Sequence, residues 1–225
     1  YKFIILYSHS FHTKVLASAM TGGAATLLPG GQTTHKTFSI PIPCLENTSC
    51  RISPTSQYAT IIRSTLFFII DEASMLTRYQ FEAIDRVMRD ITCKDIPFGG
   101  KIFILGGDFR QTLPVIRRAS TTAIVEASII SSPLWHIVRH FKLQTNMRAN
   151  DTEDEFKTFL LQMGNGDIPQ KNSAPFSDSI KIPKHFISNK SVVEDIFPVN
   201  TILSNPSVLL TRAILCPTNK EVTSI

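Results

Sequence analysis

Four short apolar runs, each followed by small or polar residues, constrain the fold of this chain most. The runs are Val15–Ala19, Leu66–Ile70, Ile102–Leu105 and Ala213–Cys216. Runs of this length and character are typical of strands buried on both faces of a parallel sheet. In such α/β sheets, ligands bind at the carboxyl ends of the strands. We therefore predict a parallel α/β sheet whose functional residues follow the strands along one edge.

The segment that begins near Thr77 has the period of an amphipathic helix. Its apolar residues recur every three or four positions up to Ile91, and Phe81 lies off that stripe, which predicts a contact outside the core. The residues expected on the charged face are Arg78, Glu82, Asp85, Arg86, Arg89 and Asp90. A second helix is predicted over Glu153–Met163 with Thr152 as its N-cap. Residues 164–200 are rich in Pro, Asn, Ser and Lys and are expected to be irregular.

Composition excludes several classes of protein. A chain of 225 residues with 43% hydrophobic content can bury a core and is not a disordered chain. Its longest apolar runs are too short to cross a bilayer, so we expect neither a membrane partner nor a signal peptide. The four cysteines form no CxxC pair, which favours a reduced intracellular protein. In a secreted protein, Cys44 and Cys50 would be the pair to form a disulfide.

Basic residues are concentrated in the first two thirds of the chain. Residues 1–70 contain five Lys or Arg and one acid, and residues 71–150 contain eleven and eight. This excess is suited to a polyanionic partner, although an ordinary solvated surface has the same composition.

The strongest single motif is the run that ends in Asp71 and Glu72. A buried strand that ends in two acids has the Walker B arrangement, in which the first carboxylate holds Mg²⁺ and the second orients or deprotonates water. The alternative is a pair of acids that favours the start of a helix.

Three further blocks follow the other predicted strands. Gly106–Val115 has two glycines that let the backbone pass close to a ligand, and Gln111 has an amide suited to sensing a γ-phosphate; the alternative is a tight turn capped by Asp108. Thr21–Gly31 is rich in small residues, which suits either a ligand contact or ordinary packing. Leu143–Arg148 ends in an arginine that can clamp phosphate.

Together these blocks resemble the Pif1-like helicases of superfamily 1, in particular their plant and Helitron-associated branch. Lys14–Pro41 is similar to the motif Ia region, Asp71–Ile91 to Walker B and the signature helix, and Pro97–Val115 to motif III. Leu143–Arg148 is similar to the end of motif IV, and Ala213–Asn219 to the first strand of a second lobe.

The resemblance implies a RecA-like, P-loop NTPase-type fold and a 5′→3′ DNA helicase that uses ATP and Mg²⁺ in DNA repair, recombination and telomere maintenance. Asp71 would serve Mg²⁺, Glu72 the attacking water, and Gln111 and Arg148 the γ-phosphate. The residues implied to contact single-stranded DNA or DNA junctions are Thr21, Gly22, Gly23 and His35. Phe38 and Phe81 are the candidates for base stacking. The implied location is intracellular, with the nucleus favoured over the mitochondrion.

One family element is missing from the sequence. None of its ten glycines lies in a GxxxxGK[ST] phosphate-binding loop, and Tyr1–Thr13 stands where that loop and its helix are expected without matching them. We therefore expect a fragment: residues 1–150 as a partial first lobe, 151–200 as a helix and irregular linker, and 201–225 as the start of a second lobe. Such a fragment would be inactive alone.

Two other functions remain open at this point. The first is a non-catalytic remnant or interaction module that binds single-stranded DNA. The second is a metal or nucleophile enzyme unrelated to ATP, for which His9-x-x-His12 and His136-x-x-x-His140 have suitable spacings but no acid or cysteine grouped with them.

Overall fold

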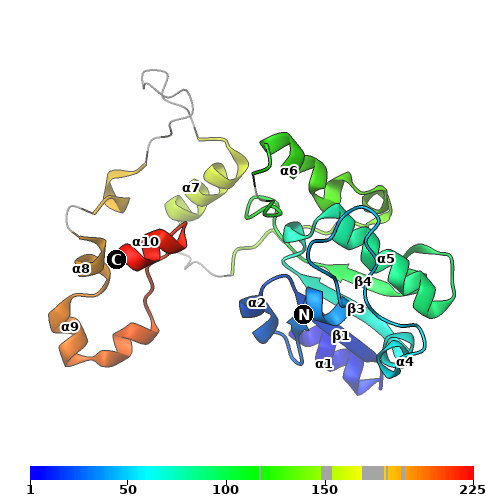
Figure 1. Cartoon of the computed structure of the whole chain (residues 1–225). Coiled ribbons are helices and arrows are strands. Elements are labelled where there is room, and N and C mark those ends of the chain that lie inside the picture. The colour runs from blue at the N-terminus through cyan, green and yellow to red at the C-terminus, as the bar shows by residue number, and fades with distance from the viewer. Residues whose placement is uncertain (117, 148–153, 169–179, 181, 189–190) are drawn as a thin grey trace. The chain divides into compact units, whose positions relative to one another are not determined.

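The computed structural model describes residues 1–116, 118–147, 154–168, 180, 182–188 and 191–225 (Figure 1). The chain divides into two units, residues 1–150 and 151–225, which are treated separately below. Within the described residues, no helix is long and apolar enough to cross a membrane.

Unit 1 is built on a four-stranded sheet of order β2-β1-β3-β4, and all its strand pairs are parallel. The strands are β1 (Lys14–Ala19), β2 (Gln32–Thr33), β3 (Thr65–Asp71) and β4 (Ile102–Leu105). Three of these are the apolar runs predicted as strands. The parallel α/β sheet expected from the sequence is therefore confirmed.

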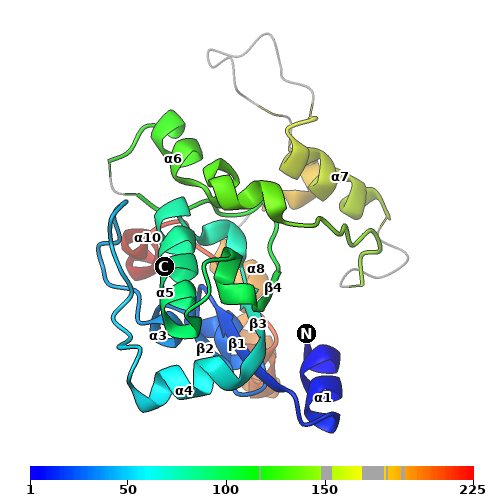
Figure 2. The same ribbon diagram turned by 90° about the vertical axis from the view of Figure 1, so that its right-hand side faces the viewer.

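Helices cover both faces of the sheet (Figure 1, Figure 2). The helices of this unit are α1 (Lys2–Ser10), α2 (Gly22–Thr26), α3 (Thr34–Phe38), α4 (Gln57–Ser64), α5 (Arg78–Thr92) and α6 (Thr121–Ala127). Side chains of β3 alternate between the two layers: Phe68 and Ile70 join the core beneath α5, whereas Ile69 packs with Ile5 of α1 on the other face. This burial on both faces explains why the β3 sequence is continuously apolar.

Helix α5 follows the predicted period, but two details of that prediction are wrong. Thr77 caps the helix, and together with Gln80 it forms a reciprocal capping box. Phe81 is fully buried, with its ring centroid 5.1 Å from that of the tilted Phe98 ring, so it does not point outside the core. Phe38 is buried as well, 6.0 Å from Phe68. Neither ring is accessible to a DNA base, because the hydrophobic effect draws both into the main core.

Asp85 also departs from its predicted position on the charged face. It is buried, with its Oδ1 accepting the Phe98 backbone N–H at 2.5 Å and its Oδ2 accepting Arg89 Nε at 2.8 Å. Phe98 belongs to a short 3-10 turn, Pro97–Gly100, that leads into β4. The carboxylate is buried because it satisfies this turn, a role that helical periodicity does not reveal.

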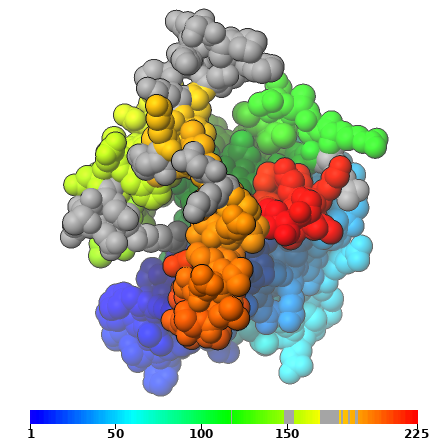
Figure 3. Space-filling view, turned by 90° about the vertical axis from the view of Figure 1, so that its left-hand side faces the viewer, coloured from blue at the N-terminus to red at the C-terminus, as the bar shows by residue number. Residues whose placement is uncertain are grey.

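Unit 2 contains α7 (Asp154–Asn165), α8 (Val192–Ile196), α9 (Val199–Ser204), α10 (Asn219–Ser224) and short 3-10 turns at Lys184–Phe186 and Pro206–Leu210. The α9 segment packs against the second of these turns (Figure 3, orange). Among the described residues of this unit, none is fully buried.

Helix α7 confirms the second predicted helix, and its predicted cap Thr152 lies outside the described residues. Helix α8 and the start of α9 show that 164–200 is not irregular throughout. Residues 213–216 are irregular, so the strand predicted there is wrong. A strand needs a neighbour for its backbone hydrogen bonds, and the described part of this unit offers none. The assignment of residues 201–225 to a second lobe stays a prediction.

Candidate functional site

Three strands end side by side at the edge of the sheet where the sequence places the functional residues. Ala19 at the end of β1 pairs with Asp71 at the end of β3. Beyond the strands, the Met20 N–H donates to the Asp71 carbonyl at 3.1 Å, and the Gly106 N–H donates to the Ile70 carbonyl at 2.9 Å. The predicted residues after β1, β3 and β4 therefore meet at one carboxyl edge.

The two acids occupy the centre of this edge. Asp71 Oδ1 accepts the backbone N–H of Glu72 at 3.0 Å. Glu72 has a left-handed backbone with φ of 54°, which turns the chain directly from β3 into the 3-10 turn Ala73–Met75. A non-glycine residue persists in this conformation only where its surroundings hold it. The turn leaves both carboxylates partly exposed at the edge.

A tyrosine contacts the first acid, which the sequence did not indicate. The phenol of Tyr1 hydrogen-bonds to Asp71, and burial, followed by the Asp71 charge, raises the pKa of the Tyr1 hydroxyl well above its usual value. The phenol is therefore protonated at neutral pH and acts as a neutral partner of the Asp71 carboxylate.

The two glycines after β4 lie close to neighbouring groups, which at Gly106 is the end of the Tyr1 side chain and at Gly107 is backbone. A Cβ on Gly106 would lie 1.3 Å from the Tyr1 hydroxyl oxygen, and a Cβ on Gly107 would lie 2.9 Å from the Ser74 backbone nitrogen. The groups that the backbone approaches here are Tyr1 and the turn after Glu72, and the close approach to a ligand stays a prediction. Ser74 Oγ is buried and has no hydrogen-bond partner among the described residues.

A tight turn follows these glycines. Asp108 Oδ1 accepts the Arg110 backbone N–H at 3.0 Å, and the Gln111 N–H donates to the Asp108 carbonyl at 3.0 Å. The Gln111 side chain is exposed. Asp108 thus caps the turn, and Gln111 is presented to solvent just beyond it.

The small residues after β1 form the start of α2. Thr21 caps this helix, with its Oγ1 accepting the Ala24 N–H at 3.2 Å. Gly22 and Gly23 are exposed, and a Cβ added to either would meet nothing within 4 Å. Packing does not require glycine at these two positions, so the backbone here is open to a ligand.

His35 links this region to α5. Its Nε2 lies 3.1 Å from Gln80 Nε2. Gln80 Oε1 already accepts the Thr77 N–H at 2.9 Å, so the Gln80 amide group that faces the ring is a donor. His35 Nε2 is therefore the acceptor of a neutral imidazole, and burial lowers the pKa of that ring. His35 serves the packing of α3 on α5 and is only partly available to a ligand.

A cavity of about 610 Å³ lies beside β4 at the same edge. The loop after β4 forms one wall, together with Tyr1 and Ser74. Residues 138–143 form another wall, and the basic side chains that line the cavity are Arg110, Arg139, His140 and Lys142. Arg110 pairs with Asp108, which also lines the cavity, at 3.6 Å, so Arg139 and Lys142 are the cations that suit an anionic ligand here.

Two aromatic rings at this cavity were missed by the sequence reasoning. Phe109 and Trp135 contact each other edge to face, with centroids 5.6 Å apart, and Trp135 lies 5.0 Å from the His140 ring. Both rings are partly exposed, unlike Phe38 and Phe81. The alternation of aromatic and basic residues from Trp135 to Lys142 was the available signal.

Two predicted features take no support from the described structure. Arg148 lies outside the described residues, so its position relative to Glu72 and Gln111 stays a prediction. Within the described ranges, no group of three or more His, Cys, Asp or Glu residues is arranged to hold a metal ion. The histidine-based metal enzyme considered above therefore gains nothing from this part of the chain.

The fold and the acidic strand end define a class: a parallel α/β domain of RecA type with carboxylates at the end of a central strand. The sequence model of the PIF1-like helicase family matches residues 1–174, and the chain belongs to this family. The matched range includes Tyr1–Thr13, although this segment contains no GxxxxGK[ST] loop. Helix α1 lies within the matched region.

Individual relatives agree with this assignment. The chain is 36% identical over 161 residues to the ATP-dependent DNA helicase PIF1 of Trypanosoma brucei brucei, covering 71% of this chain and 15% of that protein. It is 30% identical over 178 residues to the uncharacterized protein 030L of Invertebrate iridescent virus 6, covering 75% of this chain and 33% of that protein. The chain thus spans a third or less of these curated relatives.

Solved structures share the fold. Bacteroides Pif1 bound to ssDNA superimposes with a TM-score of 0.62 at 22% identity, covering 74% of this chain and 40% of that one. Bacteroides sp. Pif1 in complex with ADP-AlF4 gives a TM-score of 0.60 at 24% identity over the same shares. The RecA-like fold expected from the motifs is therefore confirmed. The plant and Helitron-associated branch stays a prediction.

Proposed function

We propose that this chain carries the carboxylate edge of an ATP-dependent 5′→3′ DNA helicase, which couples ATP hydrolysis to translocation along single-stranded DNA. The observation that carries the proposal is the position of Asp71 and Glu72, at the end of a buried central strand and beside the Gly106-Gly107 loop. The curated relatives named as ATP-dependent DNA helicases support it. DNA repair, recombination and telomere maintenance are the proposed processes. The proposed location is inside the cell, with the nucleus favoured over the mitochondrion.

The residues at this edge fit a magnesium ion held jointly with a nucleotide. Mg²⁺ is commonly bound by one or two carboxylates while substrate phosphates supply further ligands. Asp71 is the proposed ligand, and the Ser74 hydroxyl, which is buried and has no hydrogen-bond partner among the described residues, lines the cavity at the same edge of the sheet. When bound, the ion would neutralise charge on the nucleotide phosphates.

Each remaining site residue has a proposed task. Glu72 orients or deprotonates the attacking water, since its carboxylate follows Asp71 directly and is partly exposed. Gln111 contacts the γ-phosphate from the turn after β4, and Arg148 contacts it as a cation. Thr21, Gly22, Gly23 and His35 are proposed to face the DNA backbone.

These 225 residues contain no GxxxxGK[ST] loop. Charge-assisted hydrogen bonds contribute about 1.5–3 kcal/mol each. Three missing phosphate contacts would therefore weaken ATP binding by roughly three to six decades. We accordingly propose that the chain, taken alone, does not sustain ATP hydrolysis.

A second candidate function is single-stranded DNA binding without catalysis. The cavity beside β4 favours it, because Arg139 and Lys142 supply cations there while Phe109 and Trp135 supply partly exposed rings. Aromatic rings that stack on bases, together with cations that follow the backbone, are the usual means of binding single strands without sequence preference.

The catalytic proposal is tested by ATP hydrolysis of the purified chain, with and without single-stranded DNA, beside a Glu72→Gln variant. We expect that single-stranded DNA does not raise the rate of ATP hydrolysis of the native chain above the rate of the Glu72→Gln variant. Activity that Glu72→Gln abolishes would show that phosphates are held without the loop and would overturn the inactivity proposed for the chain alone.

DNA binding is tested by fluorescence anisotropy with a labelled thymidine oligonucleotide at several salt concentrations. We expect affinity to fall with salt, and Arg139→Met to reduce the slope of log affinity against log salt by about 0.7. Lys94→Met removes one exposed cation that does not line the cavity, and it is the matched control. Binding that is independent of salt would contradict this function.

A further inference from the structure

Tyr1 stands between the Asp71 carboxylate and the cavity beside β4. Tyr1 and Gly106 are among the described residues that line this cavity, whereas Asp71 and Glu72 are not. The Tyr1 hydroxyl hydrogen-bonds to Asp71. A Cβ on Gly106 would lie 1.3 Å from the Tyr1 hydroxyl oxygen and 3.4 Å from Asp71 Oδ1, so phenol and carboxylate meet over the bare backbone of this glycine. The phenol therefore occupies the approach from the cavity to the first acid.

The Asp71 side chain is oriented by its own strand end, without help from the phenol. Its Oδ1 accepts the Glu72 N–H at 3.0 Å. Its backbone is fixed on both sides, because it pairs with Ala19 and its carbonyl accepts the Met20 N–H at 3.1 Å. The hydrogen bond from Tyr1 is thus not required to aim the carboxylate. What it does is occupy an acceptor site on an ionised group, and a bond of this kind has to be broken before another ligand takes the same place.

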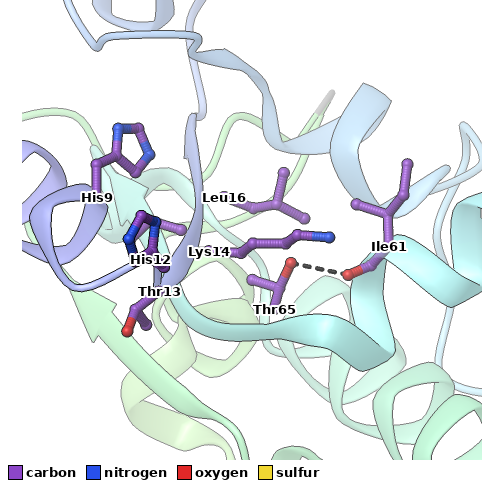
Figure 4. Close-up of a pocket in the computed structure, with 8 residues that line it drawn as sticks. His9, His12, Thr13, Lys14, Leu16, Ile61 and Thr65 are labelled. Atoms are coloured by element: carbon purple, nitrogen blue, oxygen red, sulfur yellow. Dashed lines mark hydrogen bonds between the residues drawn. The ribbon is translucent and has the colours of Figure 1, made fainter.

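Tyr1 can leave the carboxylate while α1 stays on the sheet. The helix is anchored by Ile5, which is 2% exposed and packs with Ile69 of β3. At its far end, α1 continues into β1 through a turn drawn in Figure 4, where the Thr13 N–H donates to the Ser8 carbonyl at 2.9 Å. Tyr1 precedes the helix and its side chain is partly open to solvent. Rotation about its side-chain bonds therefore moves the hydroxyl and leaves these anchors in place.

A divalent cation would compete with the phenol for this side of Asp71. Mg²⁺ binds carboxylate oxygen and keeps several of its waters, so it needs both the acceptor site and the space that the phenol fills. We propose that Tyr1 is a latch on Asp71, whose phenol lowers the affinity of the carboxyl edge for a divalent cation and rotates away when the ion binds. This inference rests on the proposed role of Asp71 as the magnesium ligand. The Tyr1 latch controls access to the site and takes no part in hydrolysis.

The test compares the affinity of the full chain for Mn²⁺ with that of Tyr1→Phe, which keeps the ring and loses the hydroxyl. Mn²⁺ suits the same oxygen ligands as Mg²⁺, and electron paramagnetic resonance measures how much of it stays free. We expect Tyr1→Phe to bind Mn²⁺ about tenfold more tightly, the change expected when one charge-assisted hydrogen bond no longer competes. Tyr1→Ala also removes the ring and should bind at least as tightly as Tyr1→Phe.

Tyr7→Phe is the matched control. Tyr7 lies on the exposed side of the same helix, 5.6 Å from the Phe3 ring, and its hydroxyl has no hydrogen-bond partner among the described residues. Its loss should leave the affinity for Mn²⁺ unchanged. A second readout follows the latch itself: in an NMR titration of the native chain with Mg²⁺, the Tyr1 ring signals should shift and those of Tyr7 should not.

Asp71→Asn, made in the Tyr1→Phe chain, separates failure of the latch from failure of the proposed function. If it lowers the affinity for Mn²⁺ while Tyr1→Phe binds no more tightly than the native chain, Asp71 is a ligand and the latch is overturned. If it leaves the affinity unchanged, the ligand role proposed for Asp71 is wrong and the latch is overturned with it. Equal tightening by Tyr7→Phe, or no saturable binding of Mn²⁺ by any of these chains, also overturns the latch. Urea unfolding of each variant establishes that it is folded.

Discussion

The Asp85 carboxylate of α5 accepts the backbone N–H of Phe98 at 2.5 Å, which ties the long helix to the turn that starts β4. Its second oxygen pairs with Arg89 at 2.8 Å. The bond holds β4 in place against β3, and the Gly106-Gly107 loop follows from the end of β4. The position of the loop at the candidate site therefore depends on a buried contact at the other end of the strand.

This relationship predicts a specific loss of stability. Asp85→Ala removes both bonds and leaves the Phe98 N–H buried without a partner, so we expect unfolding to become easier by about 1.5–3 kcal/mol. Urea unfolding followed by the fluorescence of Trp135, the single tryptophan, measures the change. Asp95→Ala removes the exposed partner of Arg89 and should cost about 0.5 kcal/mol or less. If the two variants lower the free energy of unfolding equally, the buried hydrogen bond contributes no more to stability than the exposed ion pair.

Gly107 should tolerate a methyl group poorly. A Cβ there would lie 2.9 Å from the Ser74 nitrogen and 3.2 Å from the Ala73 nitrogen, both backbone atoms that cannot rotate away. We expect Gly107→Ala to destabilise the chain by about 1–3 kcal/mol, as overpacking does. Gly23→Ala is the matched control, because its Cβ meets nothing and alanine favours a helix by about 0.4–1 kcal/mol. Thermal melts of both variants give the comparison.

Burial lowers the pKa of His35, and this predicts acid sensitivity. An unfolded histidine titrates near pH 6.5. Below that pH the unfolded chain binds a proton that the folded ring resists, so stability is retained above about pH 6.5 and falls as the pH drops. Urea unfolding at pH 7.5 and 5.5 should show that the lower pH reduces the free energy of unfolding less in His35→Asn than in the native chain. If His35→Asn loses as much stability as the native chain between these two pH values, the His35 ring has no such role.

Burial, and next the charge of Cys44, raises the pKa of the Cys50 thiol to about 12. Because the thiolate is the reactive form, Cys50 should react with a disulfide reagent far more slowly than the exposed Cys93 at pH 8. The same shift means that the folded chain keeps a proton that the unfolded chain loses. Stability should therefore decline as the pH rises from about 8.5 toward 12. Mass spectrometry of timed labelling reactions shows whether Cys93 is modified before Cys50. Rapid modification of Cys50 would contradict the prediction.

The strands and α5 were predictable because their signals are local. The apolar runs that became β1, β3 and β4 pack against the layers on both faces, although β4 at the edge of the sheet is only partly buried. Thr77 with Gln80 forms a capping box that is visible in four consecutive residues. The run at 213–216 has the same local signal, but the described residues of its unit offer it no strand to pair with, and it is irregular. A strand forms only where partners satisfy its backbone hydrogen bonds, and those partners can be far away in sequence.

The candidate site also has features that the local sequence predicts and features that depend on tertiary structure. Residue types and their order along the chain determined which positions carry the chemistry: the acids after β3, the glycines after β4 and the small residues after β1, all meeting because parallel strands share a carboxyl edge. Tertiary structure alone decided that Tyr1 lies on Asp71, that Phe38 and Phe81 are buried, and that Trp135 and Arg139 line a cavity. Burial and contact depend on segments distant in sequence, whereas periodicity and strand ends depend on neighbouring residues.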